Sequence, residues 1–280
     1  MSPTRLGAGP RPAKRETPPH IRAQEEFLAR TAVPILYGVE DTAVIRGTGT
    51  LFQFLGRVFL VTASHLFDGG IDPGSIGIPI RPFGPKLKYV RPARLNRTGE
   101  DRFDAAVVEV LDEGMARELA ASWNVLTREH LATPVAGADS VVAGYPSASA
   151  VSASGGITTT LVSIITSRLD SPPPDAQDPV DSDLDLFFEY RRSGPRYRGG
   201  DDDRTPDLEG ISGCSVWQLG SPPSGKLWTA ERQMRVVAVQ TSFNHSKFIR
   251  AKSWKAVATL FGNIDEEIGG HVQAAVFEPP

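Results

Sequence analysis

The sequence lacks several features that would place it in a special class of protein. Its 280 residues include one cysteine, and a long chain that cannot form an internal disulfide is typical of a reducing compartment. Lys and Arg number 30 against 33 Asp and Glu, so no basic excess is available for a nucleic-acid backbone. Apolar runs reach only strand length, whereas a membrane-spanning helix needs about 20 residues. We therefore expect a cytoplasmic protein whose partners include neither nucleic acid nor a membrane.

The N-terminal segment also lacks the apolar region that follows the basic residues of an export signal. Residues 1–22 are rich in Pro, Arg and Gly and offer almost nothing to bury. This composition predicts a disordered basic tail. A short helix is expected next, over residues 23–30.

What the sequence does contain is a series of short apolar runs separated by Gly-rich turns, a pattern typical of β-strands. The runs fall into two groups, which predict an N-terminal β-barrel over residues 23–125 and a C-terminal β-barrel over residues 126–280. A helical or irregular segment is expected near residues 113–123 and a helix at residues 252–261. The expected strands are 33–37, 42–45, 48–54, 58–62, 87–95 and 105–110 in the first barrel, and 140–144, 157–166, 184–190, 215–219 and 235–241 in the second.

One long stretch of the second half has the composition of a loop. Residues 169–209 contain twelve acidic residues, five arginines and six prolines, which predicts an acidic, Pro-rich insertion with a strand only at residues 184–190. Residues 170–183 are expected at the surface.

Three short segments carry residues suited to nucleophilic catalysis. His65 ends the apolar run that begins at Phe59, and Asp104 stands directly before an apolar strand. Asp101 qualifies on composition as well. Ser212 lies between Gly210 and Gly213, where the chain can turn sharply and point amide N–H groups into one concavity. Together these segments supply a nucleophile, a base and a carboxylate that can orient the base.

In this arrangement the chain resembles the trypsin-like (chymotrypsin-fold) serine peptidases, of the bacterial intracellular type. The resemblance rests on the order His, Asp, Ser, which differs from the Ser, Asp, His order of α/β-hydrolases. Further segments resemble the strand that opens the second barrel and the strand that lines the substrate cleft. The segments are Thr62-Ala-Ser-His65, Asp104-Ala-Ala-Val, Gly210-Ile-Ser-Gly213, Val141-Val-Ala-Gly-Tyr-Pro146 and Val236-Val-Ala-Val-Gln240.

The resemblance implies an all-β fold of two six-stranded-type antiparallel barrels, with the active site in the cleft between them and a helix at the C-terminus. It implies a serine endopeptidase that acts on a protein or peptide substrate through Ser212, His65 and Asp104. The amides of Gly210 and Ser212 would form the oxyanion hole. The residues implied to line the substrate cleft are Val239, Gln240 and Thr241.

No cofactor is implied by the resemblance. The remaining histidines are too dispersed along the chain to suggest a metal site, so none is predicted. Gly47-Thr-Gly-Thr50 is interpreted as a turn of the barrel and not as a phosphate-binding loop.

Two departures from the family pattern bear on activity. Ile211 occupies the position before the serine where many members carry Asp, and Cys214 stands where Gly is usual. The first departure argues against activation by a new N-terminal amine, and the second is interpreted as a small core side chain. An alternative therefore stays open, in which the chain is an inactive trypsin-fold binding module or is gated by a regulatory protein partner. Specificity also stays open, because Asp201–Asp203 suit either a basic substrate side chain or a solvated loop.

Overall fold

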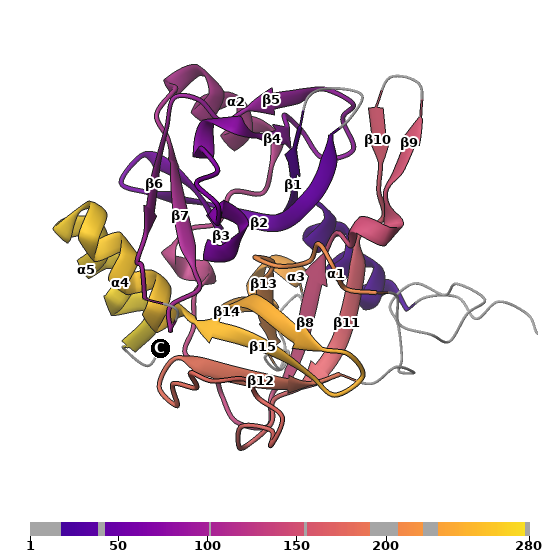
Figure 1. Cartoon of the computed structure of the whole chain (residues 1–280), viewed down its shortest axis with the longest axis vertical. Helices are drawn as coiled ribbons and strands as arrows, with labels where there is room; N and C mark the ends of the chain where they lie inside the picture. Colours follow the sequence, from indigo (N-terminus) through magenta and orange to yellow (C-terminus); the bar gives the residue numbers. More distant parts are fainter. Residues whose placement is uncertain are drawn as a thin grey trace, which may run out of the picture.

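Two curled antiparallel β-sheets make up most of the protein, as seen in a computed structural model. The structure describes residues 18–38, 43–100, 102–153, 156–190, 207–220 and 229–277. Figure 1 shows one sheet above the other, with a pair of C-terminal helices at one side. The expected β class with two barrel-like halves is confirmed, but each half is a half-barrel and the first sheet has seven strands instead of six.

The first sheet is built from strands between residues 32 and 110. Its strands β3 and β7 are buried almost throughout, and this is why they are mostly apolar without alternation. The exception is Glu109 of β7, which is paired with Arg57 of β3 at 2.8 Å. The strands, in spatial order, are β5 (Leu87–Tyr89), β4 (Ile76–Pro79), β1 (Ala32–Tyr37), β2 (Val44–Phe54), β3 (Arg57–Thr62), β7 (Ala106–Val110) and β6 (Ala93–Arg97).

The second sheet has six strands, all paired antiparallel. A separate two-stranded hairpin of β9 (Val151–Ala153) and β10 (Gly156–Thr158) projects beside it in Figure 1. The six strands, in spatial order, are β11 (Val162–Ser167), β8 (Asp139–Gly144), β13 (Ser215–Leu219), β14 (Met234–Asn244), β15 (Phe248–Ser253) and β12 (Asp185–Glu189).

Several strand boundaries differ from those expected. The Gly47–Thr50 segment is not a turn, because β2 runs through it without a break. The run 87–95 is two strands at opposite edges of the sheet, separated where Pro92 has no amide N–H to donate. The run 157–166 likewise divides between β10 and β11. Strands β4, β9 and β15 have no counterpart among the expected strands.

The helices are α1 (Pro19–Ala29), α2 (Glu113–Ser122), α3 (Ala230–Gln233), α4 (Trp254–Ile264) and α5 (Glu266–Phe277). Helix α1 begins four residues earlier than expected. A proline in its first turn explains this, since Pro is pre-organised for the helix and that turn needs no amide donor. Residues 19–22 are therefore helical and do not belong to the predicted tail, and residues 1–17 lie outside the described residues.

Helix α4 packs against the first sheet although it follows the second in sequence. Phe261 of α4 contacts Phe54 and Phe59 edge-on, with ring centroids 5.0 and 5.1 Å apart. Arg57 at the start of β3 pairs with Asp265 at 3.0 Å, just beyond α4. These contacts tie the end of the chain to the first half-barrel. Helix α5 had no counterpart among the expected helices.

The first part of the acidic insertion, before β12, lies on the surface. Residues 170–183 contain neither helix nor strand and are mostly exposed, which confirms the expected loop. Arg250 holds this loop through hydrogen bonds from its guanidinium to the carbonyls of Gln177 and Pro179. Residues 191–206, including Asp201–Asp203, lie outside the described residues. Over the described ranges, no helix has the length and apolar character required to cross a membrane.

Candidate active site

The pairing of β3 with β7 brings the predicted base and acid together. Thr62, the last residue of β3, is opposite Ala106, the first residue of β7. His65 follows three residues after Thr62, in a short 3-10 turn over Ser64–Phe67, and Asp104 precedes Ala106 by two residues. Because the strands are antiparallel, these two continuations leave the sheet at the same point.

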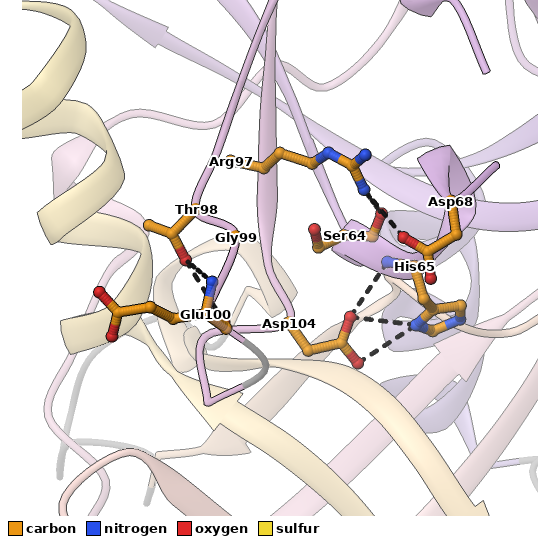
Figure 2. Close-up of a pocket in the computed structure, with 8 residues that line it drawn as sticks. All are labelled: Ser64, His65, Asp68, Arg97, Thr98, Gly99, Glu100 and Asp104. Atoms are coloured by element: carbon orange, nitrogen blue, oxygen red, sulfur yellow. Dashed lines mark hydrogen bonds and ion pairs between the residues drawn. The ribbon is translucent and has the colours of Figure 1, made fainter. Parts of the chain in front are cut away.

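His65 and Asp104 form a closely connected pair. His65 Nδ1 lies 3.1 Å from both carboxylate oxygens of Asp104, and the His65 backbone N–H donates to Oδ1 at 3.1 Å. Figure 2 shows the carboxylate facing the ring and the backbone amide at once. In the neutral ring this partner places the proton on Nδ1 and leaves Nε2 as an acceptor, which is the form a general base requires.

Asp104 holds this position in a backbone conformation that residues other than glycine rarely adopt. Its φ is +27°, and strain of this kind gathers at functional sites, with a cost on the order of 1 kcal/mol or more. A turn in which the Phe103 N–H donates to the Glu100 carbonyl at 3.0 Å leads into it. Asp101, the other candidate acid, lies outside the described residues.

A cavity of about 500 Å³ opens beside the pair. The side chains of His65 and Asp104 are 38% and 24% exposed, so a ligand in the cavity can reach both. Arg97 and Asp68 lie on its wall and pair with each other at 2.9 Å. Figure 2 shows the whole lining, which is Ser64, His65, Asp68, Arg97, Thr98, Gly99, Glu100 and Asp104.

Ser212 is carried by a tight turn before β13, and two glycines make that turn possible. Gly210 and Gly213 have φ of +95° and +90°, values that favour glycine. A Cβ on Gly213 would lie 1.9 Å from Thr62 Oγ1 and 2.7 Å from the Ala63 nitrogen. The serine turn of the second sheet therefore lies directly against the segment that leads into His65.

Thr48 of β2 forms hydrogen bonds that connect the first sheet to this turn of the second. Its N–H donates to the Ser212 carbonyl at 2.9 Å, and its hydroxyl donates to the Gly210 carbonyl at 3.2 Å. The same hydroxyl accepts the Tyr145 N–H at 2.9 Å. Thr48 was expected only as the first residue of a strand and not as part of the site. No sequence signal marks it, since its partners lie about 100 or more residues away.

The Ser212 hydroxyl donates to the Thr241 carbonyl at 3.4 Å. Among the described residues, no hydrogen bond joins it to His65. The structure thus brings His65 and Asp104 into contact and places the Ser212 turn beside them, with the serine hydroxyl bonded to β14.

The peptide between Glu209 and Gly210 has its carbonyl directed at Ser147. The Glu209 carbonyl accepts the backbone N–H of Ser147 at 2.7 Å and its hydroxyl at 3.0 Å. In a trans peptide the N–H points opposite to the carbonyl, so the Gly210 N–H points away from Ser147. Within the described ranges, neither this amide nor that of Ser212 donates to another backbone carbonyl.

The two positions at which the chain departs from the pattern of the trypsin-like peptidases lie in the same buried cluster. Ile211 and Cys214 are buried side by side in an apolar cluster that includes Val142, Leu208 and Val216. Apolar packing therefore supports the turn at the position where many family members have a carboxylate. Burial raises the pKa of the Cys214 thiol, which disfavours the reactive thiolate.

The three residues expected to line the substrate cleft are buried on β14. Val239, Gln240 and Thr241 are 0%, 0% and 3% exposed, and the backbone of the last two contacts the serine turn: the Gln240 carbonyl accepts the Gly213 N–H at 2.7 Å. Neither side-chain amide atom of Gln240 has a partner within the described part of the chain. Their assignment to substrate binding stays a prediction.

In the part of the chain that the structure describes, no group of three His, Cys, Asp or Glu side chains is arranged to hold a metal ion.

No protein-family model matches the chain, and no curated protein matches it. A solved structure described as "Aromatic interactions drive the coupled folding and binding of the intrinsically disordered Sesbania mosaic virus VPg protein" is similar at 16% identity and a TM-score of 0.45, over 81% of this chain and 87% of that one. The two curled antiparallel sheets themselves fit a trypsin-like fold.

Proposed function

We propose that the protein is a serine endopeptidase with Ser212 as nucleophile, His65 as general base and Asp104 as the carboxylate that orients His65. The observation that carries the proposal is the pair of His65 and Asp104, in which one carboxylate holds both the ring Nδ1 and the backbone N–H of the histidine. This pair stands beside a glycine-flanked serine turn, as nucleophilic catalysis requires.

The proposed reaction proceeds through an acyl-enzyme. Ser212 Oγ attacks the scissile carbonyl while its proton passes to His65 Nε2, and the negative charge that develops on the carbonyl oxygen is bound by the amides of Gly210 and Ser212. His65 then gives the proton to the leaving amine. A water molecule, deprotonated by His65, releases the acyl group and restores Ser212. Each oxyanion-hole donor contributes about 3 kcal/mol in other enzymes.

One observation favours the alternative of a partner-gated or inactive module. The Ser212 hydroxyl donates to the Thr241 carbonyl, so an active site would require its side chain to rotate toward His65. A regulatory partner or the substrate itself could supply the energy for that rotation, whereas an inactive module would never make it.

Labelling with a fluorophosphonate tests the proposal, because triad activation makes one serine reactive while other serines stay inert. We expect the full-length protein to be labelled at Ser212. Ser212→Ala should abolish the labelling, and His65→Ala should reduce it by a factor of about 1,000 or more.

Cys214→Ala is the matched control, since it removes a neighbouring nucleophilic atom that is assigned to packing. It should leave most of the labelling intact. Loss of labelling in the cysteine variant alone would overturn the mechanism. Absence of labelling in the folded wild type, with or without added protein partners, would make the inactive binding module the better account.

A further inference from the structure

A second cavity, of about 380 Å³, lies between the first sheet and the β9–β10 hairpin, which stands beside that sheet in Figure 1. Among the described residues, it shares none of its lining with the cavity beside His65 and Asp104. Its volume is within the range of small-molecule sites. The lining is Pro34, Leu36, Ile45, Pro79, Phe83, Gly84, Pro85, Leu87, Trp123, Tyr145, Ile157, Thr158 and Thr159.

One wall of this cavity is an apolar face of the first sheet. Pro34 and Leu36 are two residues apart on β1, so their side chains point to the same face. Ile45 of β2 is paired with Leu36 and extends that face. None of the described lining residues carries a charge, and an ion without a charged partner is costly to remove from water. The cavity therefore suits an uncharged molecule with an apolar body.

Aromatic side chains contribute to the lining as well. The Trp123 Nε1–H donates to the Pro79 carbonyl at 3.1 Å, so this buried ring is fixed in place and its donor is already satisfied. Phe83 is 82% exposed and has a φ of +59°. Backbone strain of this kind gathers at functional sites, and exposed apolar surface often marks a binding site. Rings at the cavity favour an aromatic ligand, because aromatic pairs gain stability beyond the area they bury.

Tyr145 brings a hydrogen-bond donor to this apolar surrounding. The residue is 5% exposed and lines the cavity, and among the described residues its hydroxyl has no hydrogen-bond partner. Burial raises the pKa of Tyr145 to about 12, so the hydroxyl keeps its proton. A buried hydroxyl without a partner is unfavourable. A ligand oxygen that accepts its proton would remove that cost.

We propose that this cavity is a binding site for an uncharged aromatic small molecule whose carbonyl oxygen accepts a hydrogen bond from the Tyr145 hydroxyl. The inference goes beyond the proposed peptidase and does not depend on it. The site nevertheless adjoins the serine turn, because the Tyr145 N–H donates to the Thr48 hydroxyl, which itself donates to the Gly210 carbonyl.

Prodan, a propionyl-dimethylaminonaphthalene, is a suitable probe because it is uncharged and aromatic and carries one carbonyl group. Its fluorescence moves to shorter wavelength in apolar surroundings and on loss of water around the carbonyl. Titration into the full-length protein should give a saturable shift with one molecule bound per chain. A shift that does not saturate, or that needs several probe molecules per chain, would overturn the proposal.

Competition against bound prodan tests the hydrogen bond in the wild type. Acetylnaphthalene keeps the carbonyl acceptor, whereas ethylnaphthalene has the same ring system without it. The first should displace prodan at a concentration about three- to tenfold lower than the second, which is the effect of one neutral hydrogen bond. Equal displacement by the two compounds would contradict the role of Tyr145.

Naphthoate tests the preference for an uncharged ligand. The Arg81 side chain lies over the lining residue Gly84, with its Cγ 2.7 Å from the position of a Cβ added there. A carboxylate drawn to Arg81 would make naphthoate the better competitor. We expect it to be weaker than acetylnaphthalene, and the reverse order would overturn the assignment of an uncharged ligand.

Tyr145→Phe removes the hydroxyl and keeps the ring, so the Kd of prodan should rise by about three- to tenfold. Tyr89→Phe is the matched control, because the Tyr89 hydroxyl donates to the Gly38 carbonyl at 3.0 Å and neither residue lines the cavity. It should leave the Kd unchanged. An unchanged Kd in Tyr145→Phe, or an equal rise in Tyr89→Phe, would contradict the proposed contact.

Ile157→Trp places a larger ring at the cavity from β10 and should abolish prodan binding. Val44→Trp adds the same ring at an exposed position of β2, on the opposite face of the strand from Ile45, and should leave binding intact. Binding that survives Ile157→Trp would locate the probe elsewhere on the molecule and overturn the proposal. Circular dichroism checks that each variant is folded, and the comparison of the two naphthalenes in the wild type decides the matter if Tyr145→Phe is not.

Discussion

The two halves of the candidate site are built on different physical principles. The pair of His65 and Asp104 is open to solvent and is held by three polar contacts to one carboxylate. The turn of Ser212 is enclosed, and it is held by glycine backbone, by apolar packing around Ile211 and by hydrogen bonds from Thr48 of the other sheet.

This difference predicts how each half of the site responds to substitution. The first half depends on the register of two neighbouring strands, so it forms whenever the first sheet forms. The second half depends on contacts between the sheets. Its turn packs so closely against Thr62 and Thr48 that a Cβ on Gly213 would overlap both residues. We therefore expect substitutions at the serine turn to affect folding, and substitutions at the pair to affect chemistry alone.

The largest effect is expected from Gly213→Ala. The added Cβ would lie 1.9 Å from Thr62 Oγ1 and 2.3 Å from the Thr48 carbonyl oxygen, and the residue has a φ of +90°. Overpacking and an unfavourable backbone conformation should together lower the free energy of unfolding by about 3 kcal/mol or more. Urea denaturation measures this loss.

Gly70→Ala separates the two causes. Gly70 has a φ of +80° but no atom within 4 Å of an added Cβ, so the backbone term acts alone and the loss should be about 1 kcal/mol. Equal losses in the two variants would show that the sheets are not closely packed at the serine turn.

An intermediate effect is expected from Thr48→Val, which keeps the shape of the side chain but removes its hydroxyl. The buried Tyr145 N–H and the Gly210 carbonyl lose their partner. Leaving a buried donor unpaired should lower the free energy of unfolding by about 1 to 3 kcal/mol. Because Gly210 belongs to the proposed oxyanion hole, the rate of fluorophosphonate labelling should fall about tenfold.

Thr50→Val provides the comparison for this substitution. The Thr50 hydroxyl is paired with that of Ser215 at 2.9 Å, also between the sheets, but it does not contact the serine turn. A similar loss of stability with little change in labelling is expected. Labelling that falls equally in both variants would mean that Thr48 acts only on stability.

The smallest effect is a gain in stability from Gln240→Met. The Gln240 side chain is fully buried, and among the described residues neither of its amide atoms has a partner. Replacing it with an apolar side chain of similar length removes an uncompensated desolvation and should raise the free energy of unfolding by about 1 kcal/mol.

Gln218→Met is the opposite case, since the Gln218 side chain accepts the Val135 N–H at 2.6 Å. It should lower the free energy of unfolding. A loss of stability in Gln240→Met as well would indicate that the buried amide is satisfied, and that the serine turn depends on polar contacts in the same way as the histidine pair.

Motifs in the sequence were sufficient to find the residues of the first half. His65 follows an apolar run and Asp104 precedes another, and the two runs pair as neighbouring strands. The glycines around Ser212 also marked its turn. Nucleophilic chemistry restricts residue types over a few positions, so these features can be recognised one segment at a time.

Longer-range features could not be recognised in this way. Thr48 is an unremarkable threonine in sequence, and its partners lie in the serine turn and directly after β8. The placement of α4 against the first sheet likewise follows from aromatic contacts that no local pattern shows.

The sequence by itself determined the β class, the two groups of strands, the surface loop and the identity of the candidate triad, because strand periodicity, loop composition and short motifs are local properties. Only the tertiary structure decided that Asp104 meets both the ring and the amide of His65 and that Thr48 of the first sheet holds the serine turn of the second. The first feature depends on the pairing of two strands within the first sheet, and the second depends on contact between the two sheets. Both bring together segments far apart in the chain, which the order of residues along one segment does not specify.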